Sequence, residues 1–128
     1  MKINDCLLTK IDIIDDDHTL LMNLLNEVLD IPVVDMPAFA EKICQAIDEH
    51  STHEEHLMLD SDYDQVQFIL HLADHHERFT KMKEDVRLFK IEEAKQAMVE
   101  HIKKYDLPLG AWLRAKPNPE GRGGSWGM

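Results

Sequence analysis

The sequence predicts an all-α fold: an antiparallel up-down-up-down four-helix bundle with an N-terminal arm and a flexible C-terminal tail. Helix breakers are scarce, because the 128 residues include five prolines and five glycines, and four of the glycines lie at or beyond Gly121. Apolar residues recur at helical spacing in four segments joined by short connections, which favours antiparallel neighbours. Strand signals are weak, since there is no Asn-Gly or Asp-Gly pair and no sustained alternation of polar and apolar residues.

The first two helices are expected on either side of a connection over residues 30–35. The first should begin near Asp15 to Asp17, whose carboxylates can cap a helix and suit its positive end. The second should begin with Asp35 as a possible cap, shortly before Pro37. Their apolar stripes consist of Leu20, Leu21, Leu24, Leu25, Val28 and Leu29 in the first helix, and Phe39, Ile43, Ala46, Ile47, Leu57 and Met58 in the second.

The last two helices follow a predicted turn over residues 60–64. The third should run from about Gln65 to Lys90 and the fourth from about Ile91 to Tyr105, with residues 107–110 (Leu-Pro-Leu-Gly) ending it. We expect the bundle to occupy residues 1–115. Residues 116–128 are rich in Gly and Pro and cannot build a core, so they are expected to form a disordered tail.

Composition restricts the partners and the compartment. A formal net charge of −11 argues against nucleic acid and against an anionic membrane surface, because both require a basic face. Cys6 and Cys44 are isolated and form neither a metal motif nor a disulfide framework, which indicates a reducing compartment. With no targeting segment and no apolar run near 18 residues, a cytoplasmic protein is expected. We expect a monomer, with an oligomer left open.

Five histidines and two carboxylates fall at four places in the chain, one in each predicted helix. Positions four residues apart share one face of an α-helix, so such a pair can aim two donor atoms at one point. Imidazole and carboxylate suit iron, zinc and manganese. The set consists of His18; His50 with Glu54; His71 with His75; and His101 with Asp106.

Any one such pair is more often a solvated helix face than a metal site. The combination is harder to dismiss, because four helices that each place a histidine beside their apolar stripe would create a costly polar centre. A shared metal cluster removes that cost, with Glu54 and Asp106 as possible bridges. No Glu stands three residues before a histidine, as ferritin-like di-iron bundles require, and no cysteine-rich zinc motif is present. His53 and His56 are expected at the surface, and Met22, Met58 and Met82 in the core.

At four places the sequence resembles the hemerythrin family. The resemblance spans about residues 10–113 and is most specific at His101-Ile-Lys-Lys-Tyr-Asp106, which continues into Leu-Pro-Leu-Gly. The other matching stretches are residues 14–21 (IDDDHTLL), 50–58 (HSTHEEHLM) and 71–79 (HLADHHERF).

The resemblance implies a di-iron centre that binds O2 reversibly. His71, His75 and His101 would ligate one iron. His18 and His50 would ligate the other, which keeps an open position. Glu54 and Asp106 would bridge the two irons together with an oxo or hydroxo group. Ala97 and Met98 would line the O2 pocket.

The sequence departs from the family pattern at three places. The connection after Glu54 is longer than usual. The aromatic residue expected three positions after the second histidine of the third helix is Phe79, which is four after His75 and three after His76. This spacing leaves two alternatives, a bulge in the third helix or His76 in place of His75. We prefer the pair His71 and His75, because Leu72 would otherwise stand where a histidine is needed.

The third departure is at the O2 pocket, where the family usually has tryptophan and leucine instead of Ala97 and Met98. A looser pocket favours autoxidation. The leading hypothesis is O2 binding for storage, delivery or sensing, without enzymatic activity. The alternatives are a di-iron enzyme on the same site, of the peroxidase, oxidase or nitric-oxide-handling kind, and iron storage or adventitious zinc binding.

Overall fold

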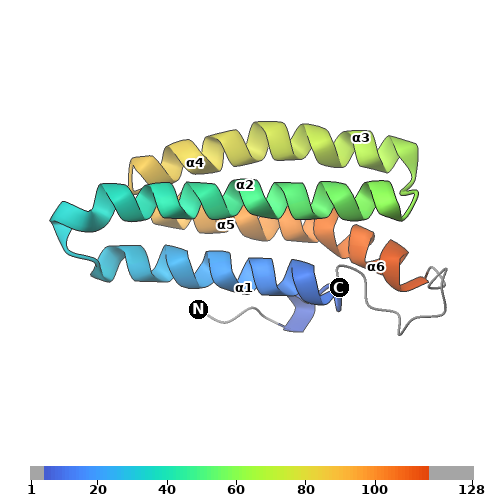
Figure 1. Ribbon diagram of the computed structural model, residues 1–128, viewed down its shortest axis with the longest axis horizontal. Helices are drawn as coiled ribbons and strands as arrows, with labels where there is room; N and C mark the ends of the chain where they lie inside the picture. Colours follow the sequence, from blue (N-terminus) through green and yellow to red (C-terminus); the bar gives the residue numbers. More distant parts are fainter. Residues whose placement is uncertain (1–4, 116–128) are drawn as a thin grey trace.

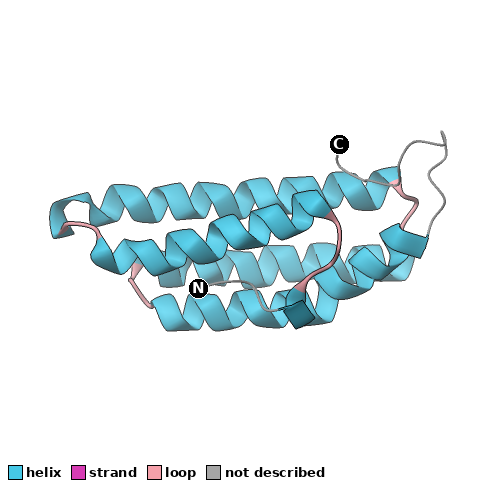
Figure 2. Ribbon diagram, turned by 90° about the horizontal axis from the view of Figure 1, so that it is seen from below, coloured by secondary structure: helices cyan, strands magenta, loops and turns pink. Residues whose placement is uncertain are grey.

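Four helical rods run antiparallel to one another, joined by short connections, as the computed structural model shows in Figure 1. The structure describes residues 5–115, and all regular elements in this range are helical (Figure 2). The predicted all-α up-down-up-down bundle is therefore confirmed. The predicted disordered tail, residues 116–128, lies outside the described residues. Among residues 5–115, no helix combines the length and apolarity that a membrane span requires.

The first two rods are single α-helices, α1 (Asp12–Glu27) and α2 (Met36–Asp60). The third consists of α3 (Gln65–Asp74), a π-helical turn η4 (His75–Phe79) and α4 (Thr80–Arg87). The fourth consists of α5 (Ile91–His101), a second π-helical turn η5 (Ile102–Asp106) and α6 (Leu107–Ala115). Short 3-10 turns lie in the N-terminal arm (η1, Asp5–Leu7) and between α1 and α2 (η2, Val28–Asp30; η3, Val33–Asp35).

Helix α1 begins three residues before the predicted position, and no side chain caps it. The Asp15 carboxylate instead accepts hydrogen bonds from the backbone N–H and hydroxyl of Thr9 and from the backbone N–H of Lys10. Lys10 has a left-handed backbone with φ 67°. The acidic run therefore fastens the N-terminal arm onto the helix rather than capping its first turn.

Helices α2 and α4 both end through a residue in the left-handed conformation. Asp62 has φ 57° and Phe89 has φ 60°. In each case the following residue donates a hydrogen bond back along the helix, from Tyr63 N to Met58 O at 3.0 Å and from Lys90 N to Asp85 O at 2.8 Å. These bonds satisfy carbonyls that a helix end would otherwise leave unpaired, and they fix the turns near the predicted positions.

The prediction that residues 107–110 end the fourth helix is wrong, because the helix continues through them to Ala115. The amide of Leu107 donates to the carbonyl of Ile102, five residues earlier. This wider π-type turn relieves the clash that the ring of Pro108 would make with the preceding turn of a regular α-helix. Gly110 is needed for close approach: a Cβ there would lie 2.8 Å from Thr9 Cβ and 2.9 Å from Thr9 O.

The interior of the bundle contains two apolar clusters. The larger one, called the long core below, comprises Leu7, Leu21, Met22, Leu24, Leu25, Val28, Ala40, Ile43, Cys44, Ile47, Phe79, Met82, Val86, Ile91, Ala94, Met98 and Ile102. The smaller one, called the end core, comprises Ile11, Ile14, Leu57, Met58, Tyr63, Leu109 and Leu113. A layer of buried polar residues lies between the two clusters.

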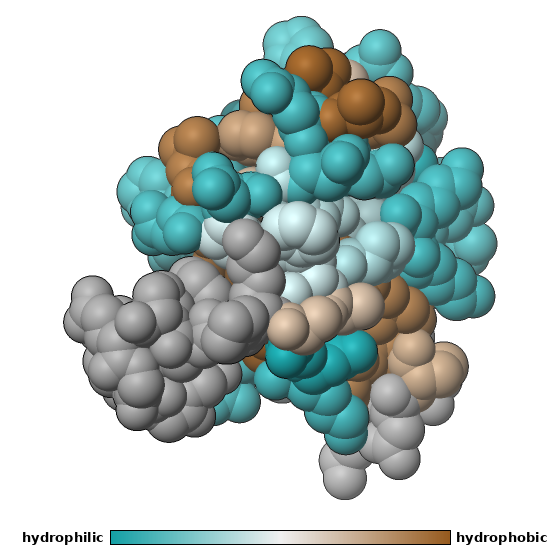
Figure 3. Space-filling view, turned by 90° about the vertical axis from the view of Figure 1, so that its right-hand side faces the viewer, coloured by the Kyte–Doolittle hydropathy of each residue, from teal (hydrophilic) through white to brown (hydrophobic). Residues whose placement is uncertain are grey.

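Some apolar side chains remain on the surface at the end where α2 gives way to α3. Figure 3 looks onto this end and shows apolar side chains gathered near its top among polar ones. Leu59, Val66, Ile69 and Leu70 are between 47% and 64% exposed. Helix α3 thus carries apolar residues on both its inner and outer faces.

Candidate metal centre

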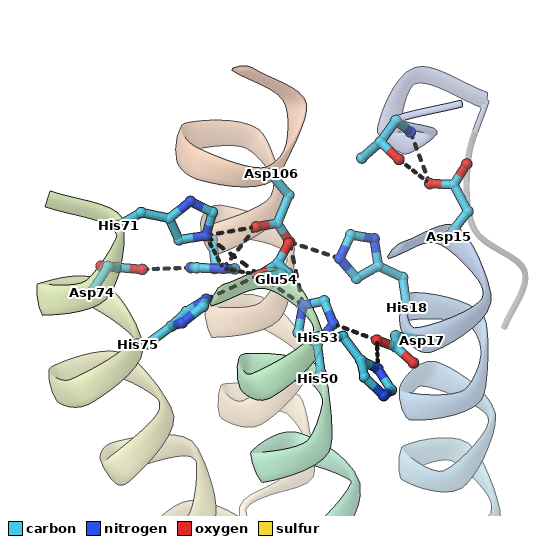
Figure 4. A network of polar contacts seen from close by, with 12 residues as sticks. Asp15, Asp17, His18, His50, His53, Glu54, His71, Asp74, His75 and Asp106 are labelled. Carbon is cyan, nitrogen blue, oxygen red and sulfur yellow. Dashed lines mark hydrogen bonds and ion pairs between the residues drawn. The ribbon is translucent and has the colours of Figure 1, made fainter. Parts of the chain in front are cut away.

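The seven predicted metal ligands lie in the layer between the two apolar cores. Helix α1 contributes His18, α2 contributes His50 and Glu54, the third rod contributes His71 and His75, and the fourth contributes His101 and Asp106. All seven are buried, with relative exposures between 0% and 5%. Figure 4 shows the imidazoles of His18, His50, His71 and His75 converging on Glu54 and Asp106. The structure thus brings together every residue of the predicted set.

The two π-helical turns explain how the rods present these residues. On a regular α-helix, positions five apart point about 140° away from each other, so His101 and Asp106 would not share a face. The turn η5 covers Ile102–Asp106, and its i to i+5 register places the two side chains on one side. The Asp106 Oδ1 atom consequently lies 2.8 Å from His101 Nε2.

The other π turn settles the register of the third rod. Turn η4 begins at His75 and ends at Phe79, which is the bulge that the spacing of the aromatic residue allowed. His75 is 5% exposed and its Nε2 lies 2.9 Å from Glu54 Oε1, whereas His76 is exposed. The rings of His75 and Phe79 stack at 4.9 Å with an interplanar angle of 18°. The structure therefore favours the pair His71 and His75.

Asp106 divides its two oxygens between two groups of histidines. Oδ1 faces His71 Nε2 at 3.1 Å and His101 Nε2 at 2.8 Å. Oδ2 faces His18 Nε2 at 2.6 Å and His50 Nε2 at 3.5 Å. A carboxylate placed in this way can bind one ion with each oxygen.

The seven buried residues are called the candidate metal layer below. Hydrogen bonds within the protein do not satisfy all of their donor and acceptor atoms. Glu54 Oε1 lies within 3.4 Å of four imidazole Nε2 atoms, those of His50, His71, His75 and His101. One carboxylate oxygen has two lone pairs and cannot accept from four donors. Two imidazole nitrogens also face each other, His71 Nε2 and His101 Nε2, at 3.3 Å. Glu54 Oε2, Asp106 Oδ1 and His50 Nε2 are buried without a hydrogen bond.

Within residues 5–115, two sets of buried donor atoms could each hold a metal ion. One set comes from Glu54, His71, His75 and His101; the other comes from His18, His50, Glu54 and Asp106. Within each set the donor atoms lie within 4.8 Å of one another. Metal coordination would give the unpaired lone pairs a partner, so the donor set fits metal ions better than it fits a hydrogen-bonded network.

The electrostatics of the layer follow from its mixed charges. Burial would raise the pKa of the Glu54 carboxyl, but the neighbouring histidines hold it well below its usual value. Burial and the charge on Glu54 would likewise raise the pKa of Asp106, and His101 together with the hydrogen bond from His18 holds it well below its usual value. The opposite holds for His50, His71 and His101: burial would lower the pKa, and the two carboxylates raise it above the usual 6.5.

Three further carboxylates contact the outer nitrogens of the imidazoles and were missed from the sequence. Asp17 Oδ2 lies 3.1 Å from His50 Nδ1, Glu55 Oε2 lies 3.1 Å from His75 Nδ1, and Asp74 Oδ2 lies 2.6 Å from His101 Nδ1. Such contacts fix the orientation and the tautomer of an imidazole ligand. The available signal was position, because each carboxylate is a sequence neighbour of a residue in the inner layer.

The histidines outside the set lie on the outer faces of the bundle. One of them, His53, makes a contact with Asp17 that the sequence did not reveal. The His53 side chain is 39% exposed, and its Nδ1 lies 2.8 Å from Asp17 Oδ2 (Figure 4). His56 is exposed. Met22, Met58 and Met82 are at most 1% exposed, as predicted for core residues.

Ala97 and Met98, the predicted pocket residues, point in different directions. Met98 is fully buried in the long core. Ala97 is only partly buried and lines a pocket of about 470 Å³ on the face between the third and fourth rods. The remaining lining residues are Asp74, Glu77, Arg78, Lys81, Asp85, Glu93, Gln96 and Glu100. The pocket therefore reaches the outer side of the layer at Asp74, the carboxylate that contacts His101.

Comparison with family models, curated proteins and solved structures gives no match to this chain. Assignment of the site therefore depends on its residues and its geometry.

Proposed function

We propose that this protein is a non-haem di-iron protein of the hemerythrin kind that binds O2 reversibly. The observation that carries the proposal is the division of Asp106, whose Oδ1 faces one group of histidines and whose Oδ2 faces the other. A carboxylate shared in this way is suited to a pair of metal ions close together. A structural zinc site would need one closed set of four ligands and no shared carboxylate.

The types of donor suit iron, although zinc and manganese accept the same donors. The layer offers imidazole nitrogens and carboxylate oxygens, and neither cysteine belongs to it. Together with Asp17, Glu55 and Asp74, the layer brings five carboxylates to the site, and these would offset much of the charge on two iron ions. The family resemblance of the sequence points to the same metal.

In this proposal two bound iron ions supply the redox chemistry that reversible O2 binding requires. The protein holds the coordination and excludes water. His71, His75 and His101 would hold one ion, His18 and His50 the other, and Glu54 and Asp106 would bridge them. The long core and the end core close the layer on both sides. Asp17, Glu55 and Asp74 orient three of the imidazoles.

A di-iron enzyme of the oxidase or peroxidase kind is the second candidate, and the surface pocket favours it. Its volume of about 470 Å³ is in the range of small-molecule sites. It is lined by Ala97, where the family usually has tryptophan, and it reaches Asp74. Filling the pocket with Ala97→Trp should then abolish turnover of a small reducing substrate while leaving O2 binding unchanged.

The main test is a visible spectrum recorded during a cycle of oxygen exposure. The metal-free protein is loaded anaerobically with ferrous iron, air is admitted, and the sample is then returned to argon. An O2-binding protein should bind two irons per chain, gain charge-transfer bands in air and lose them under argon. Rapid conversion to a stable oxidised form supports the enzyme instead. A protein that takes up zinc and no iron would rule out both.

A further inference from the structure

The proposed centre has two metal positions, and the protein supports them unequally. The three-histidine position is the one bounded by His71, His75 and His101. The two-histidine position is the one bounded by His18 and His50. A metal ligand that is already held in place loses less freedom on binding, and removal of its outer hydrogen bond typically costs about 10- to 100-fold in metal affinity. The outer contacts of the five rings therefore indicate which position binds a metal more tightly.

In the three-histidine position, two imidazoles are anchored by a carboxylate of their own. Glu55 Oε2 lies 3.1 Å from His75 Nδ1, and Asp74 Oδ2 lies 2.6 Å from His101 Nδ1. Asp74 is itself held, because Arg78 Nε donates to it at 2.8 Å while Arg78 Nη1 donates to Glu100 at 3.1 Å. This chain of contacts ties His101 to both the third and the fourth rod.

The π turns give the same position an aromatic frame. Phe79, the last residue of η4, stacks on His75 at 4.9 Å and lies 4.7 Å from the ring of His101. Tyr105, within η5, stacks on His101 at 5.6 Å and lies 5.4 Å from the ring of His71. These contacts restrain all three rings, including His71, whose Nδ1 is buried without a hydrogen bond.

The two-histidine position has much weaker outer support. Its single carboxylate, Asp17, is shared: the same oxygen lies 2.8 Å from His53 Nδ1 and 3.1 Å from His50 Nδ1 (Figure 4). The Nδ1 atom of His18 is buried without a hydrogen bond. The ring of His18 contacts the other imidazole of the same position, His50, at 4.9 Å. The ring of His50 lies 6.0 Å from Phe79, farther than the rings of His75 and His101 do.

We propose that the two positions fill in a fixed order, the three-histidine position first and the two-histidine position second, so that a stable one-metal form exists. Asp74 and Glu55 are positioning residues for the first metal and Asp17 is the positioning residue for the second. This inference rests on the proposed function only in requiring that two metals bind in this layer. It goes beyond that function because it assigns three outer residues to separate binding steps.

The order is tested by titrating the metal-free protein with Co²⁺ under argon. Bound metal is measured by equilibrium dialysis, and the visible d–d spectrum is recorded at each step. We expect two steps separated by at least about tenfold in affinity, which is the lower end of the effect of one outer contact. The first equivalent should produce one spectrum and the second equivalent a different added spectrum.

Two variants assign the steps to the positions. Asp17→Asn should weaken the affinity of the second step by about 10- to 100-fold. It should leave the affinity of the first step and the one-cobalt spectrum unchanged. Asp74→Asn should weaken the first step and alter the one-cobalt spectrum. Asp16→Asn is the matched control for Asp17→Asn: it removes the same charge from an exposed position of α1 and should change neither step.

The outcomes separate the order from the function itself. Two metals that bind with one indistinguishable constant would overturn the order and leave the di-metal proposal intact. The same holds if Asp17→Asn weakens the first step. Failure of the protein to bind two metals under any condition would instead overturn the proposed function. Far-UV circular dichroism of each variant shows whether a lost step reflects a lost fold.

Discussion

The long core and the candidate metal layer are built from the same four rods, but they differ in the kind of residue that each buries. In the long core, seventeen buried residues are apolar and form one packed cluster. In the candidate metal layer, seven buried residues are polar, and several of their donor and acceptor atoms are unpaired. The helices are regular through most of the long core and become π-helical at η4 and η5, beside the layer.

This difference indicates that the long core provides stability and that the candidate metal layer serves metal binding. Burial of apolar surface stabilises the long core without any outside partner. Burial of histidines and carboxylates costs free energy unless a ligand pairs them. Substitutions in the layer should therefore change metal content first, whereas substitutions in the long core should change stability and leave metal stoichiometry alone.

The largest expected effect is that of His101→Ala. His101 Nε2 lies within 3.4 Å of both Glu54 and Asp106, so its loss removes one proposed ligand and one contact of each of these carboxylates. We expect the variant to bind neither metal under conditions where the unaltered protein binds two, as measured by elemental analysis after dialysis. The control is His76→Ala, which removes an exposed imidazole of the same rod. Full metal content in His101→Ala would contradict the assignment of the layer.

The second prediction concerns pH. Burial opposes protonation of His50, His71 and His101, but Glu54 and Asp106 outweigh it and raise their pKa values above 6.5. A metal ion must then displace protons from these histidines at neutral pH. The metal affinity should therefore rise with pH until the pH exceeds those pKa values. Below the raised pKa values, the metal affinity should increase about tenfold per pH unit for each displaced proton.

The metal-free protein should show the opposite dependence. A histidine whose pKa is raised on folding stabilises the folded state below pH about 6.5, and this contribution is lost as pH rises through the raised pKa. Urea unfolding of the metal-free protein should therefore show falling stability over the range in which metal affinity increases. Parallel rather than opposite trends would show that these histidines are neutral before metal binds.

The third prediction tests the long core with Ile43→Ala. Ile43 is fully buried on α2, two helical turns from His50. Truncation should lower the free energy of unfolding by about 2–5 kcal/mol, because it removes buried methyl groups and leaves a cavity. Metal stoichiometry in the folded protein should remain unchanged. Chemical unfolding gives the first quantity and elemental analysis the second, and a loss of metal without a loss of stability would reverse the proposed division.

Much of the fold and the layer could be read from the sequence, because both depend on periodic patterns. Apolar residues at helical spacing predicted the four rods, and pairs such as His50 with Glu54 predicted a shared face. The π turns were harder to predict, because local insertions into a helix leave only a faint trace, such as the displaced position of Phe79. The outer carboxylates could not be assigned, because whether Asp74 reaches His101 depends on the packing of the rods.

The end of the fourth helix was mispredicted for a similar reason. Proline and glycine commonly end helices, but here Pro108 follows the wide turn η5, and Gly110 lies inside α6 against Thr9. Neither circumstance is visible in the local sequence. The glycine serves packing rather than termination.

Gly110→Ala tests that interpretation and should have a moderate effect. An added Cβ would lie 2.8 Å from Thr9 Cβ and 2.9 Å from Thr9 O, and a backbone oxygen cannot move without displacing the N-terminal arm. We expect a loss of about 1–3 kcal/mol in the free energy of unfolding, the usual cost of overpacking. Hydrogen exchange at Thr9 and Lys10 should increase, whereas amides of the long core keep their relative protection. If Gly110 made no close contact with Thr9, alanine would stabilise the protein, because alanine has a higher helix propensity than glycine inside α6.

The smallest expected effect is that of His53→Ala, which tests where the candidate metal layer ends. His53 shares Asp17 with His50, but its side chain is 39% exposed, and within the described residues it makes no hydrogen bond to Glu54 or Asp106. Asp17 would still accept the hydrogen bond from His50 after the substitution. The variant should therefore bind two metals and lose less than about 1 kcal/mol of stability, as expected for an exposed charged contact. A metal loss comparable to that of His101→Ala would move the boundary of the layer outward, because it would mean that His53 holds Asp17 in position for His50.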